Sequence, residues 1–379
     1  MLDPYCPTIN GETYLGGEVM TPTYPHPTPV GRACIACAGP VGRPTAEELW
    51  FYGHEERRGE SIVAALTAVG ATAAIEGGYV KAPVAGEVAP LLEGVATSLG
   101  ADEQAAEKVA WIIAGTGAAR AVAEGLTLRR LQVELRHRWF ARLFDEQGLY
   151  MHFQPIVSLR RREVFAHEAL VRAQHDGREL SGFEIVSTAA QAGLIVPLDA
   201  RTRRTAITQF AEDGLGGKLF INFQPSAIYN PEFCLRTTFA AIERTALRPE
   251  DIVFEVVESE EIADTGHLLR IMRTYRDHGL GVAMDDFGVG YSTTERLLQL
   301  HPDYVKLDKA LTSHVATEAA ARERVAEIVR LATAEGCRVI AEGIEDVAQR
   351  DALCDLGCEF GQGYLFARPA RRPQVTWPS

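Results

Sequence analysis

Several short apolar runs in the second half of the chain each end in an acidic residue. These runs are typical of buried strands, and the carboxylates that end them are Glu168, Glu255, Asp285, Asp286 and Glu342. An isolated buried charge is costly unless it is paired or bound to a metal ion. Barrel enzymes place their chemistry where strands end at the carboxyl side. The pattern therefore predicts a divalent metal site at the carboxyl edge of a barrel.

The order of elements after Gly148 supports the same architecture. Strand-like runs alternate with mostly amphipathic stretches, and they span residues 150–159, 163–172, 218–224, 251–258, 281–286, 304–308, 337–343 and 359–363. About eight strands in some 230 residues predict an α/β fold, a (β/α)₈ TIM-like barrel. An open doubly wound sheet is the alternative, but it would gather ligand groups at one switch point instead of at nearly every strand end.

The first third of the chain differs in texture from the rest. Residues 1–45 are rich in Pro, Gly and Thr, which predicts irregular structure. Residues 46–70 and 86–125 are rich in Ala, with apolar residues at helical spacing. We therefore expect two domains: a smaller, mainly helical domain over residues 1–138 and the barrel over residues 139–379.

A charged amphipathic helix is expected between the two domains, over residues 126–147. Its apolar residues recur at spacings of three and four, and Gly148 follows as a stop. Two interpretations remain open. The helix is either a coiled-coil-like signalling linker or a helix that packs against the side of the barrel.

Charge and hydropathy limit the partners. The net charge of −13 argues against binding to long nucleic acid. It does not argue against a small anionic ligand, because a metal ion inverts the charge of a local site. No run of 18 apolar residues predicts membrane insertion, and the N-terminus lacks the pattern of a secretory signal. We expect a cytoplasmic protein.

The chain has seven cysteines, an odd number that does not predict a disulfide framework. Cys34 and Cys37 have the spacing used in zinc sites, and Cys6 lies nearby in sequence. Together with His26 or His54 they would form a Zn²⁺ or redox site. The alternative is that they are free thiols in a loop-rich segment.

The residues at the strand ends suit hard divalent cations. Mg²⁺ and Mn²⁺ prefer carboxylate, amide and water oxygens. Glu168, Glu255 and Asp285 offer carboxylates, and Asn222 adds an amide oxygen. The adjacent pair Asp285–Asp286 would serve two metals, because two cations about 3.5–4 Å apart clamp the oxygens of a phosphoryl displacement.

Two further residues complete this hypothesis. Lys306 ends the next strand and would position a water or stabilise developing charge. Glu342 would act as a base or as a further ligand. Each residue alone has an ordinary explanation, such as a salt bridge, a turn or a surface lysine. Their occurrence on successive strands favours a site.

Eight motifs follow one another between residues 140 and 370. In chain order they are HFQPIVSL, HEALVR, FINFQPS, FEVVESEEI, MDDFGVGYSTTERL, DYVKLDKALT, VIAEGIED and GQGYLFARP. In this order they resemble the EAL family of cyclic di-GMP phosphodiesterases, over about 60% of the chain. The resemblance implies a homodimeric enzyme of bacterial second-messenger signalling. It would hydrolyse cyclic di-GMP to linear pGpG with two Mg²⁺ or Mn²⁺ ions per barrel, under control of the N-terminal domain. The alternative is a non-catalytic cyclic di-GMP receptor that signals to a partner.

The resemblance also implies a role for individual residues. The metal ligands would be Glu168, Asn222, Glu255, Asp285 and Asp286. Catalytic roles fall to Lys306, which holds the attacking water, to Glu342, and to Glu258, which anchors the loop after Asp286. Substrate-binding positions would be Gln154, Arg172 and Gln362. Within the loop after Asp286, Val289 and Thr293 replace the usual Thr and Ser.

Overall fold

The protein is described from a computed structural model that covers residues 47–53, 56–113, 118–123, 125–145, 148–256, 265–288 and 294–378. Several predicted positions lie outside these described residues: Cys6, His26, Cys34, Cys37, His54, Glu258, Val289 and Thr293. Within the described ranges, no helix is both long and apolar enough to cross a membrane.

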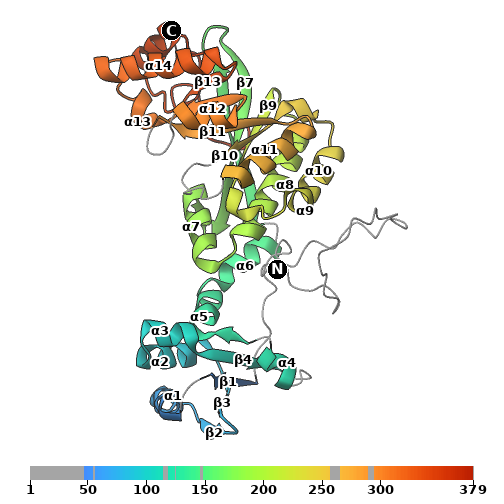
Figure 1. Ribbon diagram of the computed structural model, residues 1–379, viewed down its shortest axis with the longest axis vertical. Helices are drawn as coiled ribbons and strands as arrows, with labels where there is room; N and C mark the ends of the chain where they lie inside the picture. The colour runs from blue at the N-terminus through green and yellow to red at the C-terminus, as the bar shows by residue number, and fades with distance from the viewer. Residues whose placement is uncertain are drawn as a thin grey trace. The chain divides into compact units, whose positions relative to one another are not determined.

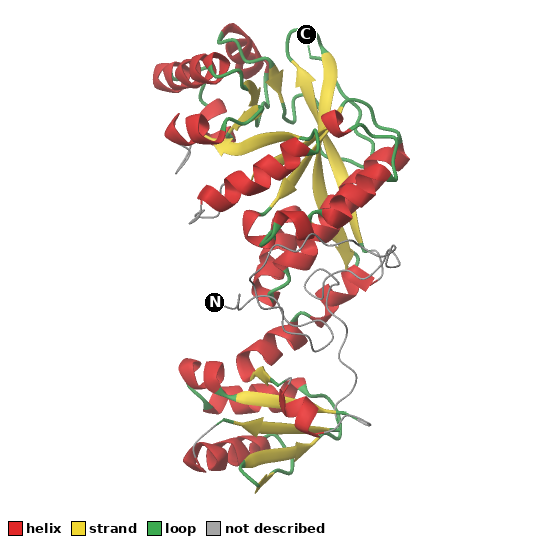
Figure 2. Ribbon diagram, turned by 45° about the vertical axis from the view of Figure 1, so that its right-hand side comes forward, coloured by secondary structure: helices red, strands yellow, loops and turns green. Residues whose placement is uncertain are grey.

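The second part of the chain forms a closed eight-stranded barrel surrounded by helices (Figure 2). Its strands are β6 (Leu149–Ser158), β7 (Glu163–His175), β9 (Lys218–Phe223), β10 (Ile252–Val256), β11 (Gly281–Phe287), β12 (Tyr304–Leu307), β13 (Arg338–Ala341) and β14 (Phe360–Gly361). They neighbour one another in the order β6-β14-β13-β12-β11-β10-β9-β7, and pairing of β6 with β7 closes the ring. The prediction of a barrel is confirmed, and each of the eight strand-like runs overlaps one of its strands.

One strand differs from a regular (β/α)₈ barrel. Strand β6 runs antiparallel to both of its neighbours, β7 and β14. Only residues 159–162 connect β6 to β7, whereas a crossover to a parallel strand needs a dozen or more residues. Arg162 completes the turn with φ of 55°. The first two strands therefore form a hairpin, and no helix lies between them.

This hairpin reaches beyond the rest of the barrel. Strand β7 pairs with β9 only from Ala166 to Ala169, but it pairs with β6 as far as Ala173. A short strand, β8 (Arg178–Leu180), adds to the free end of β7. The result is an antiparallel ribbon that continues past the carboxyl edge of the barrel.

The helices cover the outside of the strands (Figure 1). They are α7 (Gly182–Ala192), α8 (Ile195–Asp213), α9 (Pro231–Cys234), α10 (Arg236–Glu243), α11 (Thr265–Asp277), α12 (Thr294–Leu300), α13 (Lys309–Thr312), α14 (Ala319–Ala334) and α15 (Val347–Asp355), with 3₁₀ turns at Pro225–Ala227 and Pro249–Asp251. Helix α7 begins with a capping box between Ser181 and Glu184 and ends at Gly193, whose φ is 68°. Inside the barrel, Phe220, Tyr304 and Phe360 belong to a separate buried cluster.

The N-terminal domain is built on a sheet. Its elements are β1 (Glu48–Tyr52), α1 (Glu56–Ala68), β2 (Ala74–Glu76), β3 (Tyr79–Pro83), α2 (Ala89–Ser98), α3 (Ala101–Ala106), β4 (Lys108–Ile112), α4 (Ala118–Ala123), β5 (Leu126–Thr127) and α5 (Leu128–Arg136). The five strands are antiparallel, in the order β2-β3-β1-β4-β5. Leu49 and Phe51 of β1 pack with helix residues such as Ile62 and Leu92.

The prediction of a mainly helical domain is not confirmed, because the helices of this domain pack with a five-stranded sheet that the sequence analysis did not include. Strands β1 and β4 lie within the two ranges, 46–70 and 86–125, that were expected to be helical. Both strands are only five residues long and adjoin Ala-rich helices. Their own pattern of apolar residues is therefore hard to distinguish from the helical pattern of their neighbours. In β1 the burial alternates with a period of two, because Leu49 and Phe51 face the core.

The expected helix over residues 126–147 is two helices, α5 and α6 (Arg138–Asp145), which are interrupted at His137. Leu128 and Leu131 of α5 belong to the core of the N-terminal domain. Phe140 and Leu143 of α6 instead pack with buried residues of the barrel's hairpin and of α7. The second half thus follows the interpretation of a helix packed against the barrel.

Candidate active site

One edge of the barrel, to which all eight strands contribute, brings together most of the predicted site residues. They are Gln154 on β6, Glu168 on β7, Asn222 on β9, Glu255 on β10, Asp285 and Asp286 on β11, Lys306 on β12, and Glu342 and Gln362 just after β13 and β14. Strand β6 contributes to this edge although it runs in the opposite direction, because Gln154 pairs with Glu168. Asn222 is the register partner of Glu255 in the parallel pair of β9 and β10.

Lys306 is the centre of this cluster. Its side chain is 1% exposed, so it is a buried residue and not a surface lysine. Burial opposes the charge of the ammonium group, but the surrounding carboxylates outweigh it and raise the pKa of Lys306 well above its ordinary value. Its Nζ atom lies 2.7 Å from Glu342 Oε1, 3.1 Å from Asp285 Oδ1, 3.2 Å from Glu255 Oε2 and 3.4 Å from Glu168 Oε2.

Two amide side chains fix the carboxylate of Glu168. Asn222 Nδ2 donates to Oε1 at 2.9 Å, and Gln362 Nε2 donates to Oε2 at 2.6 Å. Gln362 also donates to Gln154 Oε1 at 3.1 Å. Burial alone would raise the pKa of Glu168, but Lys306 and the amide donors lower it. Glu168 is therefore ionised, and its orientation is set from two sides.

The other carboxyl groups hold their protons more tightly. Burial, followed by the neighbouring carboxylates, raises the pKa of Glu342 to about 8 and that of Asp286 to about 6. Burial also raises the pKa of Asp285, and that of Glu255 well above its usual range. One ammonium group therefore does not balance the negative charge that the site would carry if every carboxyl were ionised.

These shifts predict a pH dependence of stability for protein kept in EDTA. An acid whose folded pKa is raised binds its proton more tightly when folded, so ionising it disfavours the folded state. The ordinary pKa of a Glu side chain is 4.5, and that of Glu342 in the folded protein is about 8. Because of Glu342, the free energy of unfolding should therefore fall as the pH rises between these two values. Urea unfolding at several pH values would measure this decline. Stability that rises through this range would contradict the assignment.

The residues of the cluster fit a divalent cation. Oxygens of Asp285, Asp286 and Glu342 lie within 4.8 Å of one another. Among the described residues, Glu255 Oε1 and Gln362 Oε1 are buried and accept no hydrogen bond. Such atoms are costly to bury unless a further partner binds them. Oxygen donors of this kind are those that Mg²⁺ and Mn²⁺ prefer.

A β-bulge brings the two adjacent aspartates to the same site. In a regular strand, neighbouring side chains point to opposite faces. The pairing of β11 with β12 shifts register between Met284 and Phe287, and Asp286 has a φ of 53°. The Asp286 amide also donates to Asp285 Oδ1 at 3.1 Å. The sequence indicated the pair of carboxylates, but not the backbone irregularity that lets both reach the site.

Arg172 lies further from the cluster than the other predicted residues. It is on β7, four residues beyond Glu168, and it forms an ion pair with Glu179 of β8. The sequence analysis did not identify Glu179. That residue carries no motif, and its relation to Arg172 depends on the pairing of β7 with β8.

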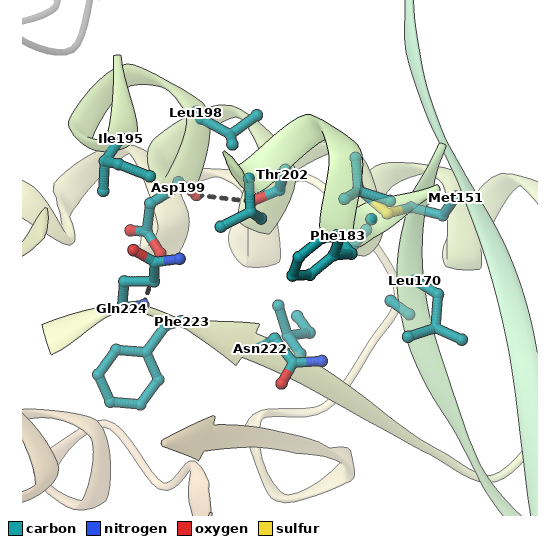
Figure 3. Close-up of a pocket in the computed structure, with 16 residues that line it drawn as sticks. Met151, Leu170, Phe183, Ile195, Leu198, Asp199, Thr202, Asn222, Phe223 and Gln224 are labelled. Carbon is teal, nitrogen blue, oxygen red and sulfur yellow. Dashed lines mark hydrogen bonds between the residues drawn. The ribbon is translucent and has the colours of Figure 1, made fainter. Parts of the chain in front are cut away.

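A pocket of about 340 Å³ adjoins the acidic cluster (Figure 3). Its walls are mostly apolar, with Leu170 and Phe183 among them, and Asn222 belongs to its lining. Leu170 also lines the smaller cavity that contains Glu168 and Glu342, so the two spaces are neighbours. Apolar walls with a few polar groups are typical of pockets that bind small ligands. This pocket was not predictable from the sequence, because its residues come from five separate elements and one connecting residue, Gln224.

Residues 137–369 match a family model described as EAL domain. The cyclic di-GMP phosphodiesterase RocR of Pseudomonas aeruginosa is 38% identical over 123 residues, which are 32% of this chain and 31% of RocR. The chain spans about a third of the length of the curated relatives it matches.

Solved structures share this fold. A standalone EAL protein from Vibrio cholerae, in a form bound to c-di-GMP, is 36% identical and has a TM-score of 0.57, with 60% of this chain and 95% of that chain covered. BlrP1 of Klebsiella pneumoniae, in a calcium and cyclic di-GMP complex, is 21% identical with a TM-score of 0.58. That alignment covers 88% of this chain and 98% of BlrP1, so the shared fold includes residues before the barrel.

Proposed function

The chain belongs to the EAL domain family, and we propose that its barrel hydrolyses cyclic di-GMP to linear pGpG with divalent cations. The observation that carries this proposal is the ring of four carboxylates around the buried Lys306. It lies at the edge where barrel enzymes carry out their chemistry. The apolar pocket beside Asn222 is available for a guanine base of the same ligand.

Two Mg²⁺ or Mn²⁺ ions would occupy this edge. Glu168, Asn222, Glu255 and Asp285 would hold the first, and Asp285 and Asp286 the second. When bound, the ions would polarise the phosphoryl oxygens and lower the pKa of a bound water. The supporting observation is the set of oxygen donors, including the unpartnered Glu255 Oε1 among the described residues.

The chain's own residues would orient the reaction and move its proton. Lys306 would donate a hydrogen bond to the attacking water and hold it in line with the scissile bond. As the water oxygen joins phosphorus, the bond to the 3′ oxygen breaks. Glu342, 2.7 Å from Lys306, would accept the proton of the water. The 3′ oxygen would take a proton from a second water molecule and leave as a hydroxyl, and Glu342 would return its own proton to the solvent. The phosphate would stay on the 5′ side as a monoester. Gln154 and Arg172 would contact the ligand.

A turnover assay on the full chain tests this function. We expect pGpG to accumulate when the protein is mixed with cyclic di-GMP and Mg²⁺ or Mn²⁺. Chromatography would detect this product. Excess EDTA should stop the reaction, and added metal should restore it. If calorimetry detects binding of cyclic di-GMP but no pGpG forms with either metal ion, the result would favour the alternative of a non-catalytic receptor. Turnover that EDTA does not affect would contradict the metal assignment.

Regulation and assembly belong to the same proposal. We propose that residues 1–138 regulate the barrel, that the protein acts in the cytoplasm and that it forms a homodimer. A Zn²⁺ or redox site at Cys6, Cys34 and Cys37 would be one means of regulation. Metal content and turnover of the Cys34→Ser variant would test it, and no change in either would contradict the cysteine site.

A further inference from the structure

One face of the β6–β7 ribbon leads from the acidic cluster to Arg172. Because side chains alternate along a strand, residues two apart share a face. The directly opposed pairs on this face are Gln154 with Glu168, His152 with Leu170, and Tyr150 with Arg172. Four residues separate Glu168 from Arg172, which is about 13 Å along an extended strand. The proposed ligand would lie along this face, between the acidic cluster and Arg172.

Glu179 of β8 holds the polar groups at the far end of this face. Tyr150 Oη donates to Glu179 Oε2 at 2.6 Å. Arg172 Nε lies 3.8 Å from Glu179 Oε1, and His152 Nε2 lies 3.5 Å from Oε2. Glu179 pairs with Gln174, which places its side chain on the same side of the sheet as Arg172. One carboxylate therefore engages the guanidinium, the phenol and the imidazole.

This ion pair is within reach of a ligand. The Glu179 side chain is 40% exposed and that of Arg172 is 15% exposed. At 3.8 Å the contact between Arg172 and Glu179 is longer than a hydrogen bond, whereas a phosphate that reaches Arg172 could accept two parallel hydrogen bonds from its guanidinium. A phosphate that approaches Arg172 must also approach Glu179, and the two negative charges repel each other.

We infer that Glu179 is an internal competitor for the phosphate of the ligand and weakens its binding at Arg172. This inference rests on the proposed function, since it concerns the same anionic ligand. Glu179 restrains Arg172 when no ligand is bound and must give it up when the phosphate arrives. Loss of this ion pair and the repulsion between Glu179 and the phosphate lower the affinity for the ligand. The same repulsion favours release of the product, which carries more negative charge than the substrate.

The test is the Glu179→Gln substitution in the full chain. Gln keeps the acceptor for Tyr150 but removes the charge. We expect the KM for cyclic di-GMP to fall about three- to five-fold, the scale of one partly exposed ion pair. The gain should appear in KM and not in kcat. In an Arg172→Gln background the same substitution should give no gain, because a double-mutant cycle isolates their coupling.

Glu163→Gln is the matched control. Glu163 lies at the other end of β7 and is exposed, with Arg161 as its ion-pair partner at 3.5 Å. This substitution removes the same charge from the same strand and should leave KM unchanged. A KM for Glu179→Gln that is unchanged or higher, with normal wild-type turnover, overturns the inference alone. Wild-type protein that neither turns over nor binds cyclic di-GMP overturns the proposed function, and this inference with it.

Discussion

Replacing Glu168 by Gln is expected to lower turnover of cyclic di-GMP by on the order of 10³-fold, the upper range for loss of one preorganised electrostatic contact. The carboxylate accepts hydrogen bonds from Asn222 and Gln362 and lies 3.4 Å from Lys306. A Gln side chain fits the space, but it removes the charge. Its amide N–H also faces Asn222 or Gln362, both of which donate hydrogen bonds here and cannot accept one from it without turning. The Gln side chain is also a poorer metal ligand than the carboxylate.

Turnover and Mn²⁺ binding of the Glu168→Gln variant would be measured together. Titration calorimetry should find weaker Mn²⁺ binding, and thermal unfolding should establish that the variant is folded. Glu163→Gln, on the same strand but exposed at its other end, should behave as the wild type. Activity of the Glu168→Gln variant within two-fold of the wild type would mean that the site is assigned wrongly.

Replacing Lys306 by Met is expected to abolish turnover and also to destabilise the protein in EDTA. The substitution leaves four carboxyl groups without the ammonium group that they share. Removing one partner of a buried ion pair costs about 3–5 kcal/mol of unfolding free energy. Mg²⁺ or Mn²⁺ should recover part of this loss, because a ligand that binds only the folded state stabilises it.

Urea unfolding in EDTA and in Mg²⁺ would separate these two effects. Lys218→Met is a suitable control, because Lys218 lies at the opposite end of β9 and contacts the Glu250 carbonyl instead of the acidic cluster. Cyclic di-GMP should still bind to the Lys306→Met variant. Loss of binding in parallel with turnover would make Lys306 a ligand-binding residue. An equal loss of stability with and without metal would contradict a cation site among these carboxylates.

The strand ends were predictable because the information for them is local. Each apolar run and its terminal carboxylate lie within a few residues, and parallel strands bring such ends to one edge without further information. The burial of Lys306 was not predictable in the same way. It follows from four carboxylates on or next to four different strands, and these residues are far from residue 306 in the sequence.

Features that depend on pairing between strands were missed. The bulge at Asp285 and Asp286 is a property of the β11–β12 register, and the contact of Glu179 with Arg172 is a property of the β7–β8 register. Strands β1 and β4 of the N-terminal sheet were missed for a related reason. Both are short, and they are stabilised as strands by pairing with each other, between residues 56 to 64 positions apart in the chain.

The antiparallel strand β6 has a consequence for how the chain folds as it is made. Its pairing with β7 is local and can form as soon as the hairpin leaves the ribosome. Its other edge waits for β14, where Phe360 pairs with Ser158 some 200 residues earlier in the chain. Throughout synthesis of the intervening strands, that edge presents unpaired amide and carbonyl groups, which other chains can pair with. The nascent protein therefore depends most on chaperone protection just before its last strand appears, and shortening the chain before residue 360 would leave the barrel open for good.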